Sequence, residues 1–328
     1  MIDLSTLPMR VGLGQMNELT DEQLLFVKQC GCDDVQLNTP KLPGEERWEY
    51  DDLAALRERA EKAGLRLMAL ENVPVRFYDQ IMLGQPGRER QLENMQQTVR
   101  NMGRAGIPIL GYHWMPNGVW RTRWDAPVRG GAGATQFRMA DVKENALTHG
   151  REYSEEELWA SYDWYLERML PVCEEAGVRI ALHPDDPPVP SLGGVPRLFR
   201  CFDAFRRALE VHDSPMHGLD FCHGCWSEMH GGEGVLDALR FFGSRGKIFY
   251  IHLRDVVGTA DDFTEVFLGD GNVNPADVIR TLKEVGFNGF IIDDHVPHMV
   301  NDTPWGHRGR AWSTGYIQAL IAAVDRPG

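Results

Sequence analysis

Short apolar segments alternate with longer amphipathic segments along the chain, and this alternation restricts the fold more than any other feature. The short segments have the length and composition of strands, whereas the longer ones carry apolar residues at helical spacing. We predict strands over residues 10–14, 34–37, 66–71, 107–112, 179–183, 217–220, 249–252 and 289–293. We predict helices over residues 21–30, 50–63, 88–105, 154–176, 197–211, 234–244, 275–285 and 310–323. Eight strands alternating with eight helices indicate an α/β fold, the (β/α)8 TIM barrel.

The chain of 328 residues has a length that such barrels commonly reach as one domain, so we expect a single domain over residues 1–328. Residues 113–153, rich in Gly, Arg and Trp, interrupt the alternation after the fourth strand. Barrel active sites lie at the C-terminal ends of the strands, so we expect this insertion to form a lid or a substrate wall. A disordered surface excursion is the alternative.

Composition narrows the expected partners. A net charge of −14 without a basic stripe would repel a phosphate backbone, so we expect no nucleic acid. No apolar run reaches the roughly 20 residues of a spanning helix, and Met1–Ser5 lacks a basic segment before an apolar one. We therefore expect no membrane association and a cytoplasmic location. We also expect a homo-oligomer, the usual state of acidic barrels of this kind.

Four successive predicted strands end near side chains that can bind a metal. These are His183, Cys222, His252 and Asp294. We prefer Asp294 to Asp293, because Asp293 points the other way if the strand continues. The C-terminal ends of barrel strands meet at one face, so the four side chains should converge. Imidazole and thiolate favour Zn, Fe, Co or Mn ions over Mg or Ca.

Cys222 and Cys225 form a C-x-x-C pair, which is typical of a redox motif or of half a zinc site. No second C-x-x-C follows, and we expect no thioredoxin-like helix at this point. We therefore favour a metal-ligand role for Cys222, with redox chemistry as the alternative. Six cysteines in a chain without a secretion signal predict reduced thiols.

Several ordered motifs together resemble the metal-dependent mannonate dehydratases, a family of xylose-isomerase-like TIM barrels. The resemblance runs from Glu45 to Leu320. The motifs that carry it are residues 71–75, residues 83–90 with Glu93-Asn94, Met115-Pro116 before Trp120-Arg121-Thr122, residues 183–188, Phe221-Cys222, His252-Leu253-Arg254 and Asp294-His295.

This resemblance implies both a site and a reaction. It makes His183, Cys222, His252 and Asp294 the ligands of a divalent metal, normally Mn²⁺, with Fe²⁺, Co²⁺ or Zn²⁺ as alternatives. It makes His295 the catalytic histidine, whose alternative role is to orient Asp294 as an outer partner. The family removes water from D-mannonate to give 2-keto-3-deoxy-D-gluconate, a step in hexuronate degradation.

Two further residues are catalytic candidates. Arg254 lies two positions beyond His252 and therefore on the same side of an extended chain, where it could clamp the carboxylate of the sugar acid. A salt bridge to Asp255 or another acid is the alternative. Glu71 ends the third predicted strand, where it could bind sugar hydroxyls or reach the metal through water.

Four residues are candidates for contact with the small sugar-acid substrate. His113 and Trp114 follow the fourth strand and could form a wall against the sugar, although core packing is an alternative for Trp114. Asp185 could reach the site, or it could fix its proline-rich loop by accepting backbone hydrogen bonds. His307 is a candidate replacement for a tyrosine that the family pattern leads us to expect.

The chain departs from the family pattern in three places. The first strand reads Val11-Gly12-Leu13-Gly14 where aromatic residues are expected, and Leu37-Asn38-Thr39-Pro40 stands where a histidine is expected. Residues 304–310 lack the expected tyrosine, which puts the identity of the general acid in doubt. The metal site is therefore better supported than the substrate.

Two other functions stay open. A sugar or sugar-acid isomerase or epimerase of the same superfamily uses an enediolate but expels no water. Such enzymes generally bind metal through two Glu, an Asp and a His, so the cysteine favours the dehydratase. A non-catalytic sugar-acid-binding barrel would keep metal and ligand binding and lose turnover.

Overall fold

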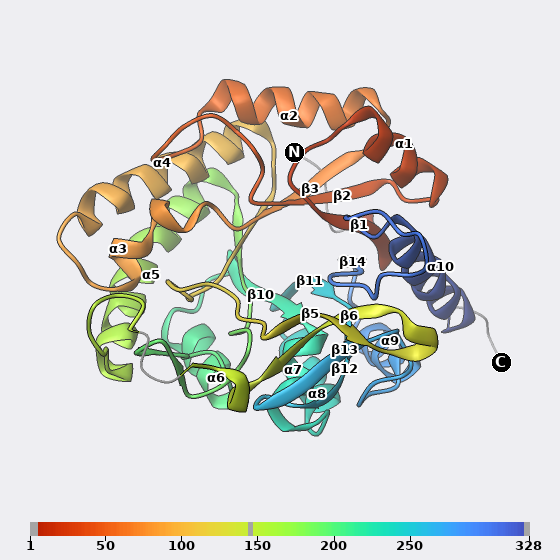
Figure 1. Cartoon of the computed structure of the whole chain (residues 1–328). Helices are drawn as coiled ribbons and strands as arrows, with labels where there is room; N and C mark the ends of the chain where they lie inside the picture. Colours follow the sequence, from red (N-terminus) through yellow and green to blue (C-terminus); the bar gives the residue numbers. More distant parts are fainter. Residues whose placement is uncertain (1–5, 144–146, 325–328) are drawn as a thin grey trace.

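Eight parallel strands close into a barrel in the computed structural model, which describes residues 6–143 and 147–324 (Figure 1). Each barrel strand pairs with the next one along the chain, and the last, β14, pairs with β1. The strands are β1 Arg10–Met16, β2 Asp34–Asn38, β3 Arg66–Glu71, β4 Ile109–Tyr112, β7 Arg179–Leu182, β10 His217–Cys222, β11 Ile248–His252 and β14 Phe290–Ile292. The predicted (β/α)8 barrel is confirmed. The segment Met1–Ser5 lies outside the described residues.

Helices form the outer layer around these strands (Figure 1). They are α1 Asp21–Gln29, α2 Tyr50–Lys62, α4 Arg88–Ala105, α5 Glu155–Ala176, α6 Phe202–Val211, α8 Val235–Gly243, α9 Pro275–Glu284 and α10 His307–Val324. Thr20 and Ser154 form capping boxes at the starts of α1 and α5, and Asn274 caps α9. Within residues 6–143 and 147–324, no helix is both long enough and apolar enough to cross a membrane.

Helix α6 starts later than predicted. We expected a helix from residue 197, but Arg197 is buried and donates from Nη2 to the carbonyl oxygen of Gly118 at 2.8 Å. The approach to α6 is instead a loop that contacts the insertion, and it follows a short hairpin of β8 Ser191–Leu192 and β9 Val195–Pro196.

Five short helices lie between the barrel elements in the part of the chain that the structure describes. They are the α-helices α3 Asp79–Met82 and α7 His223–His230 and the 3-10 helices η2 Val75–Phe77, η3 Arg129–Gly131 and η4 Met139–Asp141. We expected no thioredoxin-like helix at the Cys222/Cys225 pair and predicted no helix there, but an α-helix, α7, begins directly after Cys222. Seven of its eight residues are buried, so the segment lacks the one-sided apolar pattern that reveals a helix.

The barrel interior is filled by its own side chains. Met68, Ala69, Ile109, Ala181, Phe249, Tyr250, Phe290 and Ile292 form a buried cluster. The rings of Tyr250 and Phe290 stack with their centroids 5.1 Å apart. Because this packing closes the barrel, chemistry is confined to the C-terminal ends of the strands.

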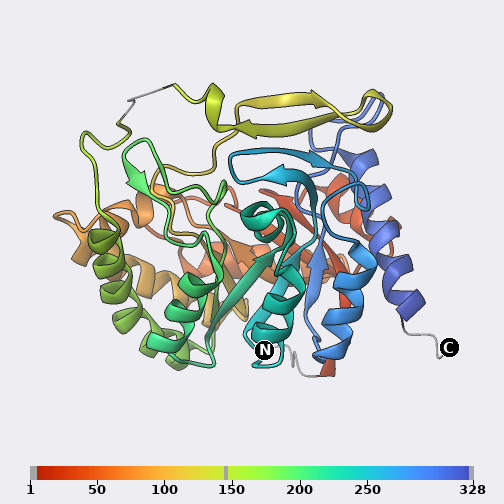
Figure 2. The same ribbon diagram turned by 90° about the horizontal axis from the view of Figure 1, so that it is seen from below.

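A second sheet lies across that end of the barrel (Figure 2). We call it the cover sheet: it consists of β5 Arg123–Pro127, β6 Gly133–Arg138, β12 Asp255–Thr259 and β13 Asp262–Val266, paired in the order β12-β13-β6-β5. Strands β5 and β6 belong to the predicted insertion, whereas β12 and β13 follow β11. The antiparallel pairing of β13 with β6 joins these two connections, which the sequence does not predict.

Candidate metal centre and catalytic site

The four predicted ligands lie together at the C-terminal ends of β7, β10, β11 and β14. One potential ligand atom from each of His183, Cys222 and His252 lies within 4.8 Å of the other two, and all three side chains are buried. Asp294 completes the group: its Oδ2 lies 3.8 Å from Cys222 Sγ, and its Oδ1 lies 3.7 Å from His252 Nδ1. The fold thus brings two imidazoles, a thiol and a carboxylate to one place.

Both histidines have a ring nitrogen available for a metal. His183 Nδ1 lies 2.7 Å from the carbonyl oxygen of Pro184, which can only accept, so Nδ1 keeps its proton and Nε2 is the nitrogen that can bind a metal after it loses its own proton. Both ring nitrogens of His252 are buried; Nε2 faces Glu71 at 3.0 Å, whereas Nδ1 makes no hydrogen bond within the described residues. A buried polar atom without a partner is costly, and a metal ion at Nδ1 of His252 would remove that cost.

The charges around Cys222 favour its thiolate. Burial alone would raise the pKa of this thiol, but a hydrogen bond from Cys225 and the positive charges of Arg254 and His183 lower the pKa well below its ordinary value. Burial likewise opposes the charged form of His183, yet the Cys222 thiolate raises the pKa of that histidine to about 10. A thiolate is the form of cysteine that binds metals.

The neighbouring Asp293 lies on the other side of the chain. Its Oδ1 is 3.1 Å from Nη1 of Arg310, and burial raises the pKa of this carboxyl to about 6. The same Arg310 nitrogen donates to the backbone oxygen of Asp294 at 2.9 Å. Arg310 therefore fixes the end of β14 and turns the side chain of Asp294, not that of Asp293, toward the site.

A second buried group shares His252. The Nε2 atom of His252 lies 3.0 Å from Glu71 Oε2 and 3.4 Å from Asp220 Oδ2. Burial raises the pKa of Asp220 to about 8. Two carboxyl groups thus flank the imidazole on the side opposite Asp294, where they orient the ring.

A third group of possible ligands is already occupied by an arginine. Asp186, Cys225 and Glu228 are close enough to hold an ion. However, the Arg254 guanidinium lies 3.1 Å from Asp186, 3.2 Å from Cys225 Sγ and 2.8 Å from Glu228. It supplies the positive charge that these groups need, so they form an ion-pair network and not a metal site.

Arg254 is not free to clamp a substrate carboxylate as predicted. Its side chain is 1% exposed, and its Nε donates to Asp294 Oδ2 at 2.9 Å while both Nη atoms face the acids described above. Asp255, the partner that we considered, instead accepts hydrogen bonds from the backbone of Val256, Gly269 and Gly271. Arg254 therefore holds the predicted ligand Asp294 in position.

His295 lies at the edge of the metal centre. Its side chain is 36% exposed, its Nδ1 lies 2.8 Å from Glu265 Oε1, and its Nε2 lies 3.7 Å from Asp294 Oδ1. Burial would lower the pKa of this imidazole, but the carboxylates of Asp294 and Glu265 outweigh burial and raise the pKa. Because Glu265 takes the Nδ1 proton as a hydrogen bond, Nε2 is the nitrogen left for chemistry.

Sequence reasoning missed Glu265 and Arg121. Glu265 lies on β13, and no motif marks it. Arg121 precedes β5 and donates to both oxygens of Asp186 at 2.6 and 2.8 Å and to Glu265 Oε1 at 2.7 Å, with 1% of its side chain exposed. The signal for Arg121 was its place in the motif Trp120-Arg121-Thr122, to which no role was given.

His113 lies beside the predicted ligands, whereas Trp114 does not line the site. The backbone N–H of Met115 donates to His113 Nδ1 at 3.1 Å, so Nε2 carries the hydrogen, and burial and the charge of His183 lower the pKa of His113 to about 3. Trp114 is fully buried, and its ring centroid lies 5.0 Å from that of Tyr162 and 5.3 Å from that of Tyr165. Trp114 is therefore a core residue.

The other two substrate candidates also have structural contacts. Asp185 is fully buried and accepts from the backbone N–H of Phe199 at 2.6 Å, so it fixes its loop. His307 begins α10, and its Nδ1 lies 2.6 Å from Thr303 Oγ1. Its ring packs on Phe26 of α1, with 4.8 Å between the two ring centroids. Neither contact brings these side chains to the predicted metal ligands.

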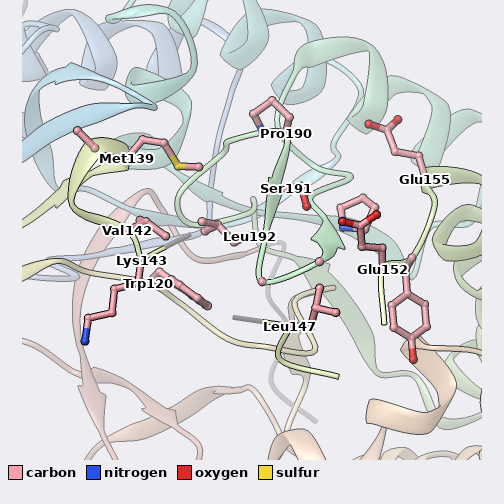
Figure 3. A pocket seen from close by; sticks show the side chains of 15 residues that line it. Trp120, Met139, Val142, Lys143, Leu147, Glu152, Glu155, Pro190, Ser191 and Leu192 are labelled. Carbon is pink, nitrogen blue, oxygen red and sulfur yellow. The ribbon is translucent and has the colours of Figure 1, made fainter. Parts of the chain in front are cut away.

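A separate pocket of about 800 Å³ lies between the insertion and the β8–β9 hairpin (Figure 3). Trp120, Met139 and Lys143 line one side, and Glu152, Ser191 and Leu192 line the other. None of its lining residues belongs to the group around Cys222, so this pocket and the metal centre are different places.

Comparisons with known proteins show the family to which the chain belongs. The family model described as D-mannonate dehydratase (UxuA) matches residues 14–150 and 132–327. Mannonate dehydratase from Thermotoga maritima is 29% identical over 87% of this chain and 89% of its own length. Mannonate dehydratase 2 from Halalkalibacterium halodurans is 30% identical over 84% of this chain and 85% of its own. The crystal structure of mannonate dehydratase from Streptococcus suis serotype 2 superposes with a TM-score of 0.87 at 28% identity, covering 96% of this chain and 94% of that one. The chain therefore belongs to the D-mannonate dehydratase family of hydro-lyases.

Proposed function

We propose that this protein is a metal-dependent dehydratase that converts D-mannonate to 2-keto-3-deoxy-D-gluconate, as a step in hexuronate degradation. The observation that carries the proposal is the convergence of His183, Cys222, His252 and Asp294, with the imidazole of His295 beside them. Membership of the family supports the reaction type, and the names of its relatives support the substrate.

The donor set fits a divalent transition metal. His183 offers Nε2, His252 offers Nδ1, Cys222 offers a thiolate and Asp294 offers a carboxylate. Two nitrogens, a sulfur and an oxygen suit Mn²⁺, Fe²⁺, Co²⁺ or Zn²⁺, and we favour Mn²⁺. When bound, the metal would act as a Lewis acid toward the negative charge that develops at the substrate carboxylate.

The elimination moves two protons. A base takes the proton from C2, and the electron pair of that C–H bond forms an enediolate with the carboxylate. The pair then forms the C2=C3 bond as the C3–O bond breaks and the hydroxyl gains a proton to leave as water. The resulting enol then loses the proton of its C2 hydroxyl and gains a proton at C3, which gives the 2-keto acid.

His295 is our candidate for the base. Glu265 holds its Nδ1–H, which directs the Nε2 lone pair toward the metal centre and stabilises the imidazolium formed after proton transfer. His113 presents an Nε2–H in a neutral ring and is our candidate donor to a substrate oxygen. Arg254 acts as a positioning residue for Asp294.

We propose that the cover sheet, together with residues 113–153, walls the site and excludes water. Arg121 supports this role, because it joins the insertion to Asp186 beyond β7 and to Glu265 on β13. Exclusion of water strengthens the electrostatic interactions on which the reaction depends.

The first test is product formation. Protein stripped of metal with a chelator and then freed of the chelator receives Mn²⁺ and D-mannonate, and 2-keto-3-deoxy-D-gluconate is measured by mass spectrometry. We expect product only with metal. Cys222→Ser should lose most of its bound metal. His295→Asn should keep the metal and lose activity by about 10²- to 10⁴-fold.

Matched controls separate chemistry from folding. Cys201→Ser and His149→Asn change the same residue types outside the site and should keep metal and activity. Full metal content and activity in Cys222→Ser would show that the proposed coordination is wrong. Absence of product despite bound metal would contradict dehydration of D-mannonate.

An isomerase or epimerase is the second candidate. Glu71 and Asp220 beside His252 are the observation in its favour, since carboxylates dominate the metal sites of the isomerases considered above. The same incubation distinguishes the two reactions: an isomerase yields a product of unchanged mass, whereas a dehydratase yields one lighter by a water molecule.

A further inference from the structure

Four carboxamide side chains surround Glu71 at the C-terminal ends of β1, β2 and β3. We call Gln15, Gln36, Asn38 and Asn72 the amide cluster. Gln36 Nε2 donates to Glu71 Oε2, and Gln15 Nε2 reaches the same oxygen at 3.4 Å. The Nδ2 atoms of Asn38 and Asn72 donate to Glu71 Oε1 at 3.3 and 3.4 Å. One carboxylate thus organises four amides drawn from three strand ends.

The backbone at these strand ends is strained. Gln15, Thr39 and Asn72 have φ angles of 58°, 41° and 61°, in the left-handed region that favours glycine. Such a conformation costs of order 1–3 kcal/mol for a residue other than glycine and persists where the surroundings enforce it, often at binding sites. At Gln15 and Asn72, this backbone carries the amides that face Glu71.

The amide cluster adjoins the metal centre. Glu71 Oε2 lies 3.0 Å from His252 Nε2, and the opposite nitrogen of that ring lies 3.7 Å from Asp294 Oδ1. One imidazole ring therefore separates the amides from the predicted ligands. If the carboxylate and C2 of the substrate lie at the metal centre, a chain of further carbons that extends toward β1, β2 and β3 meets these amides.

The outer amides keep hydrogen-bonding capacity. Gln15, Asn38 and Asn72 are half-buried, and their contacts to Glu71 are near the upper limit for a hydrogen bond. The oxygen of Asn72 has no hydrogen-bond partner within the described residues. Amides donate and accept, as sugar hydroxyls do, so the two groups match each other.

The cluster has an acidic centre whose cationic neighbour, the imidazole of His252, is already shared between Glu71 and Asp220. Among residues 6–143 and 147–324, no lysine or arginine forms a hydrogen bond or ion pair with the four amides or with Glu71. A second carboxylate or a phosphate at this place would face Glu71 and Asp220 with no lysine or arginine to compensate its charge. Uncharged hydroxyl groups meet no such penalty.

We infer that the amide cluster binds the hydroxyl groups at the end of the substrate remote from its carboxylate, and selects acids with one carboxylate over those with a second acidic group at that end. This inference rests on the proposed dehydration for the placement of the substrate. Asn38 lies in a segment where the chain departs from the family pattern, so this specificity is a property of this chain's own residues.

The test compares three acids that share the reacting end, including the configuration at C2. D-mannonate has the full hydroxylated tail, L-glycerate lacks the tail, and D-mannarate carries a second carboxylate at its end. Their dissociation constants are measured by calorimetry on the Mn²⁺-loaded full chain, with the His295→Asn substitution present to prevent turnover. The same titrations use Asn38→Ala and Asn72→Gly, since glycine suits the left-handed backbone at residue 72.

We expect D-mannonate to bind more tightly than both other acids. The dissociation constant of D-mannarate should exceed that of D-mannonate by about tenfold or more. Each amide substitution should weaken the binding of D-mannonate by about threefold to tenfold, the effect of one lost hydrogen bond, and leave the binding of L-glycerate unchanged. Asn94→Ala is the matched control, because its amide bonds Glu46 on the outer surface of the barrel.

Equal affinities for D-mannonate and L-glycerate overturn the inference, as does D-mannarate binding as tightly as D-mannonate. Amide variants that weaken the binding of D-mannonate and of L-glycerate equally also overturn it, because general damage to the site has that effect. Tail-dependent binding without turnover by the unsubstituted protein contradicts the dehydration and leaves the subsite standing. Failure of all three acids to bind contradicts both proposals.

Discussion

In the proposed mechanism, the carboxylate of Glu265 determines how His295 works. The 2.8 Å contact to Nδ1 fixes the ring and its tautomer, and Arg121 holds Glu265 from the other side. A base whose orientation depends on a second residue should lose rate, and not substrate affinity, when that residue is neutralised.

Glu265→Gln should therefore lower kcat by about tenfold to a hundredfold. KM and metal content should stay within about twofold of the original protein, because the amide keeps the shape of the side chain and Arg121 and Arg254 keep their other carboxylate partners, Asp186 and Asp294. Steady-state kinetics and metal analysis measure these quantities. Asp262→Asn, on the same strand and at the surface, is the control. A raised KM with unchanged kcat would assign Glu265 to substrate binding.

Sequence reasoning worked at residues whose place follows from strand alternation. It selected Asp294 over Asp293, and the structure turns Asp294 toward the other three predicted ligands. It could not place Arg254, because its partners Glu228 and Asp186 come from other connections. It missed Glu265 because an acid on an exposed-looking hairpin carries no local sign of the histidine that it contacts across the site.

At the scale of elements, the buried contacts of Arg121 hold the insertion against the rest of the barrel. This guanidinium forms a two-point contact with Asp186 and a third hydrogen bond with Glu265, all out of water. Removing one partner of a buried ion pair is costly, because the remaining charges stay buried.

Arg121→Met should lower the free energy of unfolding by about 3–5 kcal/mol. Urea titration followed by fluorescence measures the change. Arg123→Met is the matched control two residues away, where the pair with Asp125 is at the surface and contributes less than about 1 kcal/mol. Equal stability of the two variants would show that the buried contacts of Arg121 do not anchor the insertion.

The barrel helices could be predicted because each has one buried face and thus a clear period, and the barrel strands because most are short apolar runs buried on both faces. Helix α7 has no exposed face apart from His230, so its sequence lacks that period. The cover sheet was missed for a different reason: its central pairing joins β6 and β13, which lie far apart in sequence, and register between distant strands leaves no local pattern.

At the scale of the whole molecule, His217 makes stability depend on pH. Nδ1 of this buried ring faces the carbonyl oxygen of His212 at 3.3 Å, and Nε2 faces the hydroxyls of Tyr112 and Tyr162 at 3.1 and 3.3 Å. Burial lowers the pKa of His217 from 6.5 to about 3. The unfolded chain therefore binds a proton near pH 6.5, whereas the folded protein stays neutral at this residue until about pH 3.

Acidification should thus favour the unfolded state by about 1.4 kcal/mol for each pH unit below 6.5. The chain with His217→Gln should lack this contribution, so its stability relative to the original protein should improve as the pH falls from about 7 to about 5. Urea titrations across this range measure the difference, with His149→Gln as the control. A constant difference across the range would contradict the neutral, buried state of His217.

The cover sheet is built half from the connection after β4 and half from the connection after β11. Neither half is a transferable module. A loop graft that exchanged only residues 113–153 between two members of this family would pair the β6 of one member with the β13 of the other, and the contact of Arg121 with Glu265 would join parts of two different sequences. To transfer substrate specificity from one relative to another, both connections must therefore be exchanged together, although they are separate stretches of the chain.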